Sequence, residues 1–403
     1  MGLLPTNLPG NPLTSKIADI DIKDFLSKHL YTKKEVDDWF AGKAFPFAKY
    51  HGEFGWLLND ARFADGVNDS YSVYTYAKNN GERIMSNYKE KSCRINTYGN
   101  SFTQCHEVSD HETWQEILAA HLQEPVRNFG IGGWSVYQAY LRMLKEEKEK
   151  PAEYIIFNIY EDDSFRNLDS WRNFRVNKHP NFIEPTLPYC KVDLKNQLLT
   201  EHKNPCPTPE SVYNLCSLDK TYEIFKDDFV LHTMWAHENS KDENASLKYK
   251  EIMDLTQTHG IETQLDTNST VSEVAAEYHK RCALFSTKKI IEKITAYCAN
   301  NDKKLLLVLS YPAKYIAASH TSDSRWDQEL VDFIYEKGLP CIDLYKSHIS
   351  EFSQYNIEMT EYLKKYFIGH YNPRGNFFCA SSIREKLIDI LNPKPMPYIN
   401  QPP

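Results

Sequence analysis

Two nearly continuous apolar runs constrain the fold of this chain more than any other feature of its sequence. They are Tyr154–Tyr160 and Lys304–Tyr311. A strand with one face in solvent alternates apolar and polar residues, whereas a parallel strand covered on both faces is apolar along its whole length. Because helices cover the faces of such a sheet, the two runs predict an α/β architecture.

Three shorter segments complete a repeating order of strand and helix. The strands are predicted at Cys93–Tyr98, Pro125–Phe129 and Leu339–Leu344. Apolar residues recur at helical spacing in the segments 111–122, 135–149, 281–299, 328–337 and 377–391. We therefore predict a five-stranded parallel sheet with helices on both faces, a three-layer α/β/α fold. Right-handed crossovers then bring the carboxyl ends of all five strands to one edge.

The remaining segments are predicted to be additions to this core. Residues 1–90 are expected to form an N-terminal extension packed on the core, whose first half is residues 91–170. Residues 171–277 are rich in proline and break the strand–helix order, so we expect an insertion that forms a lid or substrate wall. The second half of the core is residues 278–392, and a proline-rich tail follows at 393–403.

Composition and charge exclude several classes of protein. The net charge of -8 argues against non-specific nucleic-acid binding. Nine cysteines, an odd number without a CxxC pair, predict free thiols rather than a disulfide framework or a zinc ribbon. The first residues show no signal-peptide pattern, and no apolar run is long enough for a membrane span. We therefore expect a cytoplasmic protein with no membrane partner; the sequence does not define an oligomeric state.

Ser101 is the first candidate for chemistry, because Gly99–Asn100–Ser101 separates the first strand from the helix that follows. A serine in this place projects its hydroxyl from the carboxyl edge of the sheet. Unpaired backbone N–H groups beside it suit a nucleophile that must hold a developing oxyanion. The alternative interpretation is an ordinary turn in which Ser101 caps the helix.

Three further groups are predicted at the same edge. After the second strand, Gly130–Gly133 places three glycines in four positions, which indicates a tight turn or a close approach to a ligand. Glu161–Asp163 ends the third strand and is either a solvated loop or part of a site. His370 precedes the last helix and is either a base or an ordinary capping residue. Because all follow strands or open helices on one edge, we expect them to converge on one cleft.

The order of these blocks resembles that of the SGNH (or GDSL) hydrolase family, over roughly residues 91–170 and 280–392. The family places its nucleophile in a Gly-Asp-Ser turn, which Gly99–Ser101 matches. Its Asn-x-Gly-x-x-Gly block, whose last glycine lends an N–H to the oxyanion hole, is matched by Asn128–Gly133. Its His-x-Asn-x-x-Gly block is matched by His370–Gly375. The resemblance implies a sheet of the SGNH type and a serine esterase.

Two positions depart from the family pattern. The third block of the family reads Gly-x-Asn-Asp, whereas this chain has Asp162 in place of the Asn and Asp163 in place of its neighbour. If Asp162 occupies the place of that Asn, three interpretations stay open. Its carboxyl group is protonated, it is turned away from the acyl oxygen, or it anchors a cationic group of the substrate. The family also often has an Asp three residues before its histidine, where this chain has Phe367. What orients the imidazole of His370 is therefore left open.

The function implied by the resemblance is hydrolysis of a carboxylic ester, and the expected substrate is a carbohydrate or another small polar molecule. Ser101 would attack the ester, His370 would act as general base, and the N–H groups of Ser101 and Gly133 would bind the oxyanion. One alternative is a catalytically weak relative that only binds its ligand. Another is an acyltransferase, or an enzyme that uses Asp162 and Asp163 for other chemistry.

The predicted site residues fall into two groups. The catalytic group is Ser101, Gly133, Asp162 and His370, and the substrate-binding group is Asn100, His106, Trp134, Asp163 and Arg374. Trp134 either stacks on a sugar or closes the core. No cofactor is expected, because the glycine spacing is not that of a dinucleotide site. No metal is expected either, because the histidines and acids of the segment 105–112 match no standard ligand spacing.

Overall fold

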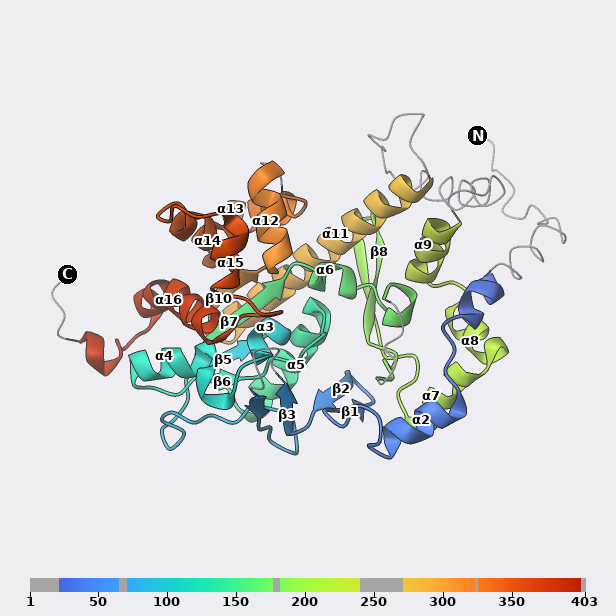
Figure 1. The fold of residues 1–403 in the computed structure, drawn as a ribbon, viewed down its shortest axis with the longest axis horizontal. Helices are drawn as coiled ribbons and strands as arrows, with labels where there is room; N and C mark the ends of the chain where they lie inside the picture. The colour runs from blue at the N-terminus through green and yellow to red at the C-terminus, as the bar shows by residue number, and fades with distance from the viewer. Residues whose placement is uncertain (1–21, 65–70, 177–181, 240–270, 323–324, 400–403) are drawn as a thin grey trace. The chain divides into compact units, whose positions relative to one another are not determined.

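A computed structural model describes residues 22–64, 71–176, 182–239, 271–322 and 325–399 (Figure 1). The chain divides into two compact units. The first comprises Met1–Phe45 and Asp169–Arg281, and the second comprises Pro46–Leu168 and Cys282–Pro403. The predicted insertion at 171–277 falls in the first unit, and both predicted halves of the core fall mainly in the second. That the insertion covers the site stays a prediction.

The second unit contains the predicted parallel sheet. Its strands are β5 (Ile95–Tyr98), β6 (Arg127–Asn128), β7 (Tyr154–Tyr160), β10 (Lys304–Ser310) and β11 (Cys341–Asp343). They lie in the order β11-β10-β7-β5-β6, and every pair in the sheet is parallel. Counted along the chain this order is 2-1-3-4-5, that of a doubly wound α/β fold. The predicted fold class is confirmed.

Helices connect these strands and cover the sheet. They are α4 (Trp114–Leu122), α5 (Val136–Glu149), α11 (Val271–Asn300), α12 (Ala313–Ser322), α13 (Gln328–Glu336), α14 (Leu344–Phe352), α15 (Met359–Lys364) and α16 (Pro373–Ile390). α4 lies beside α16, and α5 packs on β5 (Figure 1). α16 begins earlier than predicted, because Asn372 caps it by accepting from the Gly375 N–H and Pro373 occupies its first position.

Smaller elements complete the two units. In the second unit β1 (Ala48–His51) pairs with β2 (Gly55–Leu58), and β3 (Ala61–Ala64) pairs with β4 (Tyr71–Tyr74). The first unit holds the hairpin of β8 (Tyr189–Asp193) and β9 (Leu198–His202), with α2 (Lys33–Phe40), α7 (Pro209–Val212), α8 (Leu218–Phe225) and α9 (Phe229–Glu238). The tail, which the sequence predicts to be free of helix, forms a short 3-10 helix at Met396–Tyr398.

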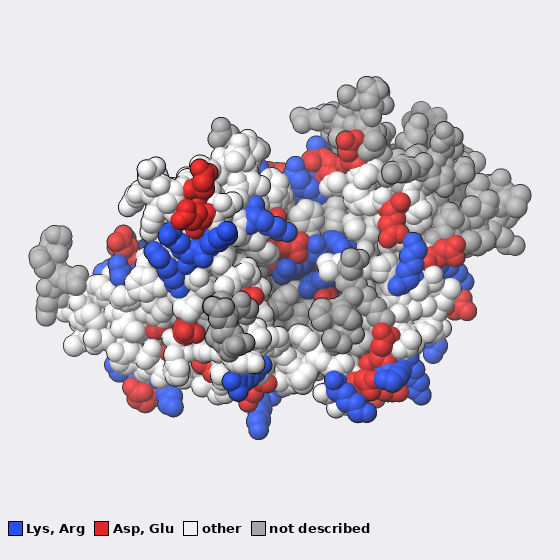
Figure 2. All heavy atoms as spheres, viewed as in Figure 1, with Lys and Arg blue, Asp and Glu red and all other residues white. Residues whose placement is uncertain are grey.

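The visible surface carries charges of both signs. Figure 2 shows Lys and Arg side chains interspersed with Asp and Glu side chains over the face in view. Among the described helices, none has the length and apolar character that crossing a membrane requires.

Glycines allow the loop after β6 to press against α3 (Ser101–Gln104), the short helix that begins with Ser101. A Cβ on Gly130 would lie 2.2 Å from the Gln104 nitrogen and 2.5 Å from the Thr103 carbonyl carbon. A Cβ on Gly99, whose φ is +149°, would lie 2.3 Å from the Thr103 hydroxyl oxygen. The close approach therefore requires glycine at both positions.

We predict that Gly130→Ala lowers the free energy of unfolding by about 3 kcal/mol or more, because the added methyl overlaps backbone atoms that cannot turn away. Gly338→Ala is the matched control. Its Cβ would have no heavy atom within 4 Å, but its φ of +62° is left-handed, so the substitution should cost only about 1–2 kcal/mol. Urea denaturation measures both variants, and equal losses would contradict the prediction.

Candidate active site

Ser101 and His370 meet at the carboxyl edge of the sheet. Ser101 follows β5 directly and is the first residue of α3, while Asn100 provides the cap by accepting from the Phe102 N–H at 2.8 Å. The Ser101 Oγ lies 2.9 Å from the His370 Nε2. Ser101 is 9% exposed and the His370 side chain 28% exposed. The two side chains form a hydrogen-bonded pair in which the serine is buried and the imidazole is partly exposed.

Glu107 lies on the other side of the His370 imidazole. Its Oε2 is 3.6 Å from the His370 Nδ1, and the same oxygen accepts from the backbone N–H groups of Gly369, at 2.9 Å, and of His370. Burial alone would raise the pKa of Glu107, but the His370 side chain and these two N–H groups outweigh it and lower the pKa to about 2. The carboxylate is therefore ionised at neutral pH.

Sequence reasoning missed Glu107. The residue has a φ of +73° and belongs to the turn that ends α3, so its position follows no periodic pattern. Its one sequence signal is its place beside His106, close to the candidate nucleophile. Phe367, the position where the family often carries an orienting Asp, is 7% exposed and pairs with Tyr371 in an isolated bridge.

His106 also lies beside His370, as its place near Ser101 suggests. The two ring centroids are 5.1 Å apart in an edge-to-face arrangement. The His106 ring further contacts the rings of Phe47, Phe63 and Tyr74. Burial, and then the nearby charge of His370, lowers the pKa of His106 to about 4, so this imidazole is neutral at physiological pH.

The glycine turn after β6 lies next to Ser101. A Cβ on Gly132 would be 3.6 Å from the Ser101 Cβ, and Gly133 has a φ of +79°. Within the described part of the chain, the N–H groups of Ser101 and Gly133 donate to no backbone acceptor. Both donors are therefore available for a ligand oxygen.

The third block anchors the nucleophile turn. Asp163 is 1% exposed and accepts from the Asn100 side chain at 2.8 and 2.9 Å, from the Tyr160 N–H at 3.0 Å and from Arg166 at 2.9 Å. Asp162 precedes the short helix α6 (Asp163–Arg166) and accepts from the Arg166 Nε at 2.7 Å. One guanidinium thus pairs with both carboxylates, and burial raises the pKa of Asp163 to about 7. Asp163 also ties the end of β7 to the Ser101 turn.

The other predicted substrate-binding residues have differing surroundings. Asn100 and Trp134 are both 0% exposed, and the Trp134 ring packs 5.1 Å from the Phe54 ring, as a core side chain does. Arg374 is exposed, with its guanidinium 5.1 Å from the centroid of the Tyr366 ring. Their role in binding substrate stays a prediction.

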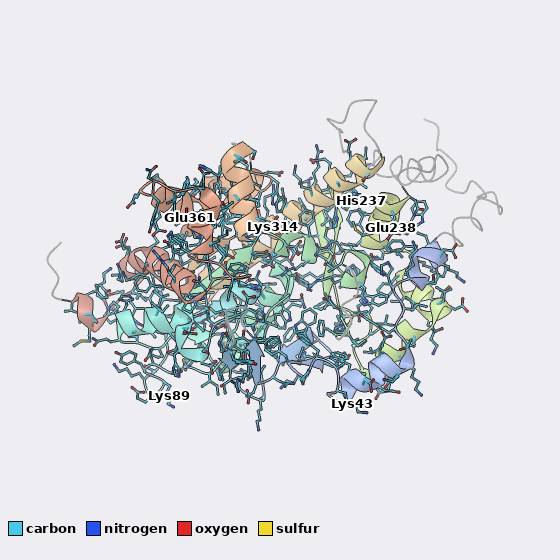
Figure 3. The ribbon with its side chains drawn as sticks, in the orientation of Figure 1. Lys43, Lys89, His237, Glu238, Lys314 and Glu361 are labelled. Carbon is cyan, nitrogen blue, oxygen red and sulfur yellow. The ribbon has the colours of Figure 1, made fainter. Side chains whose placement is uncertain are left out.

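A groove of about 270 Å³ lies between α12 and α15. Its apolar floor is formed by Ala313, Ala317, Leu363, Phe367 and Ile368, with Lys314 and Lys364 also lining it. Figure 3 labels Lys314 on α12 and Glu361 on α15. The groove borders the segment that carries His370, since the Ile368 N–H donates to the His370 carbonyl at 3.0 Å.

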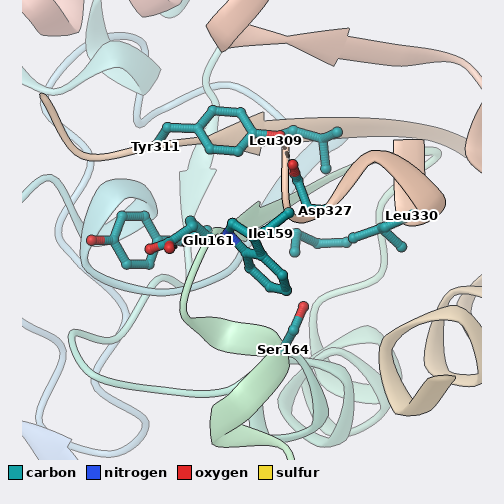
Figure 4. Close-up of a pocket in the computed structure, with 9 residues that line it drawn as sticks. Ile159, Glu161, Ser164, Leu309, Tyr311, Asp327 and Leu330 are labelled. Carbon is teal, nitrogen blue, oxygen red and sulfur yellow. Dashed lines mark hydrogen bonds between the residues drawn. The ribbon is translucent and has the colours of Figure 1, made fainter. Parts of the chain in front are cut away.

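A second cavity lies beneath the end of β7 and is too small for a substrate. Its volume is about 10 Å³, about that of one water molecule. Glu161, Ser164 and Asp327 are among its lining residues, and the Tyr311 hydroxyl donates to Asp327 at 2.9 Å (Figure 4). Glu161, the first acid of the third block, therefore faces this cavity together with Trp326, to which it is hydrogen-bonded at 3.2 Å.

The sheet has the doubly wound strand order, with a serine after its first strand and a histidine before the last helix, which is the arrangement that the sequence resemblance to the SGNH/GDSL hydrolases predicts. Two solved structures are similar to the chain. One, described as a lipolytic protein of the G-D-S-L family from Desulfitobacterium hafniense DCB-2, has 11% identity and a TM-score of 0.31, covering 72% of this chain and 98% of its own. The other, an acetyl xylan esterase, has 14% identity and a TM-score of 0.35, covering 73% and 99%. No protein-family model and no curated protein matches the sequence.

A buried histidine supports the segment that carries His370. His348 is 0% exposed, and its ring nitrogens lie 2.8 Å from the Tyr371 hydroxyl and 3.0 Å from the Tyr362 hydroxyl. Burial lowers the pKa of His348 to about 3. The unfolded chain binds a proton at this residue near pH 6.5, whereas the folded chain does not until about pH 3. Acidification through this window therefore favours unfolding.

We predict that wild type loses about 2 kcal/mol more stability than His348→Gln when the pH falls from about 7.5 to about 5, because only wild type must exclude that proton. Gln keeps a polar group for the two tyrosine hydroxyls. Urea denaturation at both pH values gives the measurement. His320→Gln, at an exposed position of α12, is the control and should leave the pH dependence unchanged. Parallel pH dependence in wild type and His348→Gln would contradict the prediction.

Proposed function

We propose that this protein is a serine hydrolase that cleaves carboxylic esters. The observation that carries the proposal is the contact of 2.9 Å between the Ser101 Oγ and the His370 Nε2, with the Glu107 carboxylate on the opposite side of the same imidazole. A nucleophile, a base and an acid that orients the base are the three parts that acyl transfer through serine requires.

In the proposed reaction the Ser101 Oγ attacks the ester carbonyl carbon while His370 Nε2 takes the hydroxyl proton. The carbonyl oxygen becomes an oxyanion, which accepts hydrogen bonds from the N–H groups of Ser101 and Gly133. Collapse of this intermediate breaks the bond to the alcohol, which leaves with the proton from His370. Water then attacks the acyl-enzyme with the same base, releasing the acid and restoring Ser101.

In the proposed mechanism Glu107 orients the His370 imidazole, which the apolar side chain of Phe367 cannot do. An ionised carboxylate beside Nδ1 favours the tautomer with its proton on that nitrogen, which leaves the Nε2 lone pair directed at Ser101. It also stabilises the imidazolium that forms during the attack. Glu107 also accepts from the backbone N–H groups of Gly369 and His370. It therefore fixes the position of the imidazole ring as well as stabilising the charge that forms on it.

We propose that Asp162 acts through Arg166 and does not complete the oxyanion hole. An ionised carboxylate 4 Å from the oxyanion would repel it by about 4 kcal/mol at an effective dielectric constant of 20. The ion pair of 2.7 Å with Arg166 keeps the carboxylate engaged elsewhere. The two backbone N–H groups are then the proposed donors.

The proposed substrate is a small polar ester, of which acylated carbohydrates are one form. The groove between α12 and α15 is smaller than the roughly 300–1,000 Å³ of pockets that enclose drug-sized ligands. Its apolar floor beside the His370 segment suits a short acyl group. The lysines that line it suit a polar or anionic group on the same substrate.

We predict that Ser101→Ala abolishes hydrolysis of a short aryl ester, such as p-nitrophenyl acetate, and changes the melting temperature little. A fluorophosphonate should label wild type at Ser101, as peptide mass spectrometry would show, and should not label the variant. The control is Ser353→Ala, because Ser353 lies at an exposed position. Ser135 is unsuitable as a control because it caps a helix. Full activity of Ser101→Ala would exclude the covalent mechanism.

We predict that Glu107→Gln lowers kcat by about 10²- to 10⁴-fold, since the amide can still accept from the backbone N–H groups but cannot stabilise the imidazolium. KM should change much less, because the substrate is not expected to touch this side chain. Steady-state kinetics with the same aryl ester measures both constants. Glu336→Gln, at an exposed position of α13, is the control. A loss of activity that appears only in KM would contradict the role given to Glu107.

A further inference from the structure

We propose that His106, Glu107 and His370 form a binding site for a divalent transition-metal ion such as Zn²⁺, and that the bound ion inhibits Ser101. Each residue offers one ligand atom, and the three atoms lie within 4.8 Å of one another. Two imidazole nitrogens and one carboxylate oxygen are a donor set that zinc uses where it keeps a fourth position open. Binding itself does not depend on the proposed ester hydrolysis, whereas the inhibition does.

The geometry requires only a small adjustment to accept a metal. Zinc bonds of about 2.0–2.2 Å in a tetrahedral arrangement place ligand atoms roughly 3.3–3.5 Å apart. The His370 Nδ1 and the Glu107 Oε2 are already 3.6 Å apart. A His106 ring nitrogen already lies within 4.8 Å of the other two ligand atoms, so it must approach them by about 1 Å for tetrahedral coordination.

The three groups have the electron pairs that a metal needs. The His370 Nδ1 is buried and has no hydrogen-bond partner among the described residues. Glu107 accepts both backbone N–H groups through Oε2, but an ionised carboxylate has about four lone-pair sites on its two oxygens, so electron pairs remain for a metal. The His106 ring contacts the rings of Phe47, Phe63, Tyr74 and His370. A buried Nδ1 that makes no hydrogen bond to a described residue, beside a carboxylate at 3.6 Å and a second imidazole, is therefore the observation that points to a cation.

Inhibition follows from the tautomer of His370. A metal bound at Nδ1 takes the lone pair there, so the ring proton must move from Nδ1 to Nε2. The Nε2–H then donates to the Ser101 Oγ and has no lone pair to accept the serine proton. Ser101 stays in place but is no longer activated, and removal of the metal by a chelator returns the proton to Nδ1.

The test uses the full chain with Co²⁺ as a spectroscopic probe and Zn²⁺ as a competitor. Wild type and Ser101→Ala should bind Co²⁺ equally, with an absorption spectrum free of thiolate charge transfer. His106→Ala should bind about tenfold more weakly or worse, and Glu107→Gln provides a second ligand variant should His106→Ala fold poorly. His111→Ala, at an exposed position, is the matched control and should bind like wild type.

Zn²⁺ should also inhibit ester hydrolysis by wild type reversibly, while His106→Ala should resist inhibition relative to its own metal-free rate. Equal Co²⁺ affinity in wild type and both ligand variants, or a thiolate charge-transfer band, would overturn the metal site. Binding at the site without any effect on the rate would overturn the inhibition alone. If no ester is hydrolysed, the proposed function fails, but the Co²⁺ spectra still decide whether the metal site exists.

Discussion

β7 and β10 pair in parallel from Tyr154 to Tyr160 and from Lys304 to Ser310, and nearly all of their side chains are buried. A parallel pair of this kind is stable only when helices cover both of its faces. The crossovers to β5, β6 and β11 then have to place every carboxyl end on one edge of the sheet. The convergence of Ser101 and Asp163, which follow β5 and β7, results from this constraint.

Around that edge, two carboxylates have different tasks because their surroundings differ. Asp163 is fully buried and accepts from Asn100, Arg166 and the backbone, so it holds the nucleophile turn in position. Glu107 is partly exposed, and its side chain faces the imidazole. In the proposed mechanism the first residue keeps Ser101 in place and the second orients the base His370, as a preorganised site requires.

The same closeness that makes His370 a suitable base also exposes it to metal ions. Its Nδ1 has a carboxylate on one side and the His106 ring nearby, and a cation there would compete with the proton that the catalytic tautomer requires. The proposed activity and the proposed inhibition are therefore two states of one imidazole, distinguished by whether Nδ1 carries a proton or a metal.

The sequence alone determined the fold class and the order of the chemical blocks. Apolar runs specify buried strands, and glycines specify the turn against α3. Each of these signals is local, because the residues that carry it lie within a few positions of one another along the chain. The tertiary structure decided which groups meet. Glu107 is adjacent to His370 only because α3 ends in a left-handed turn that faces the start of α16, far away along the chain. Likewise, the pairing of both Asp162 and Asp163 with Arg166 depends on side-chain directions, which residue spacing does not specify.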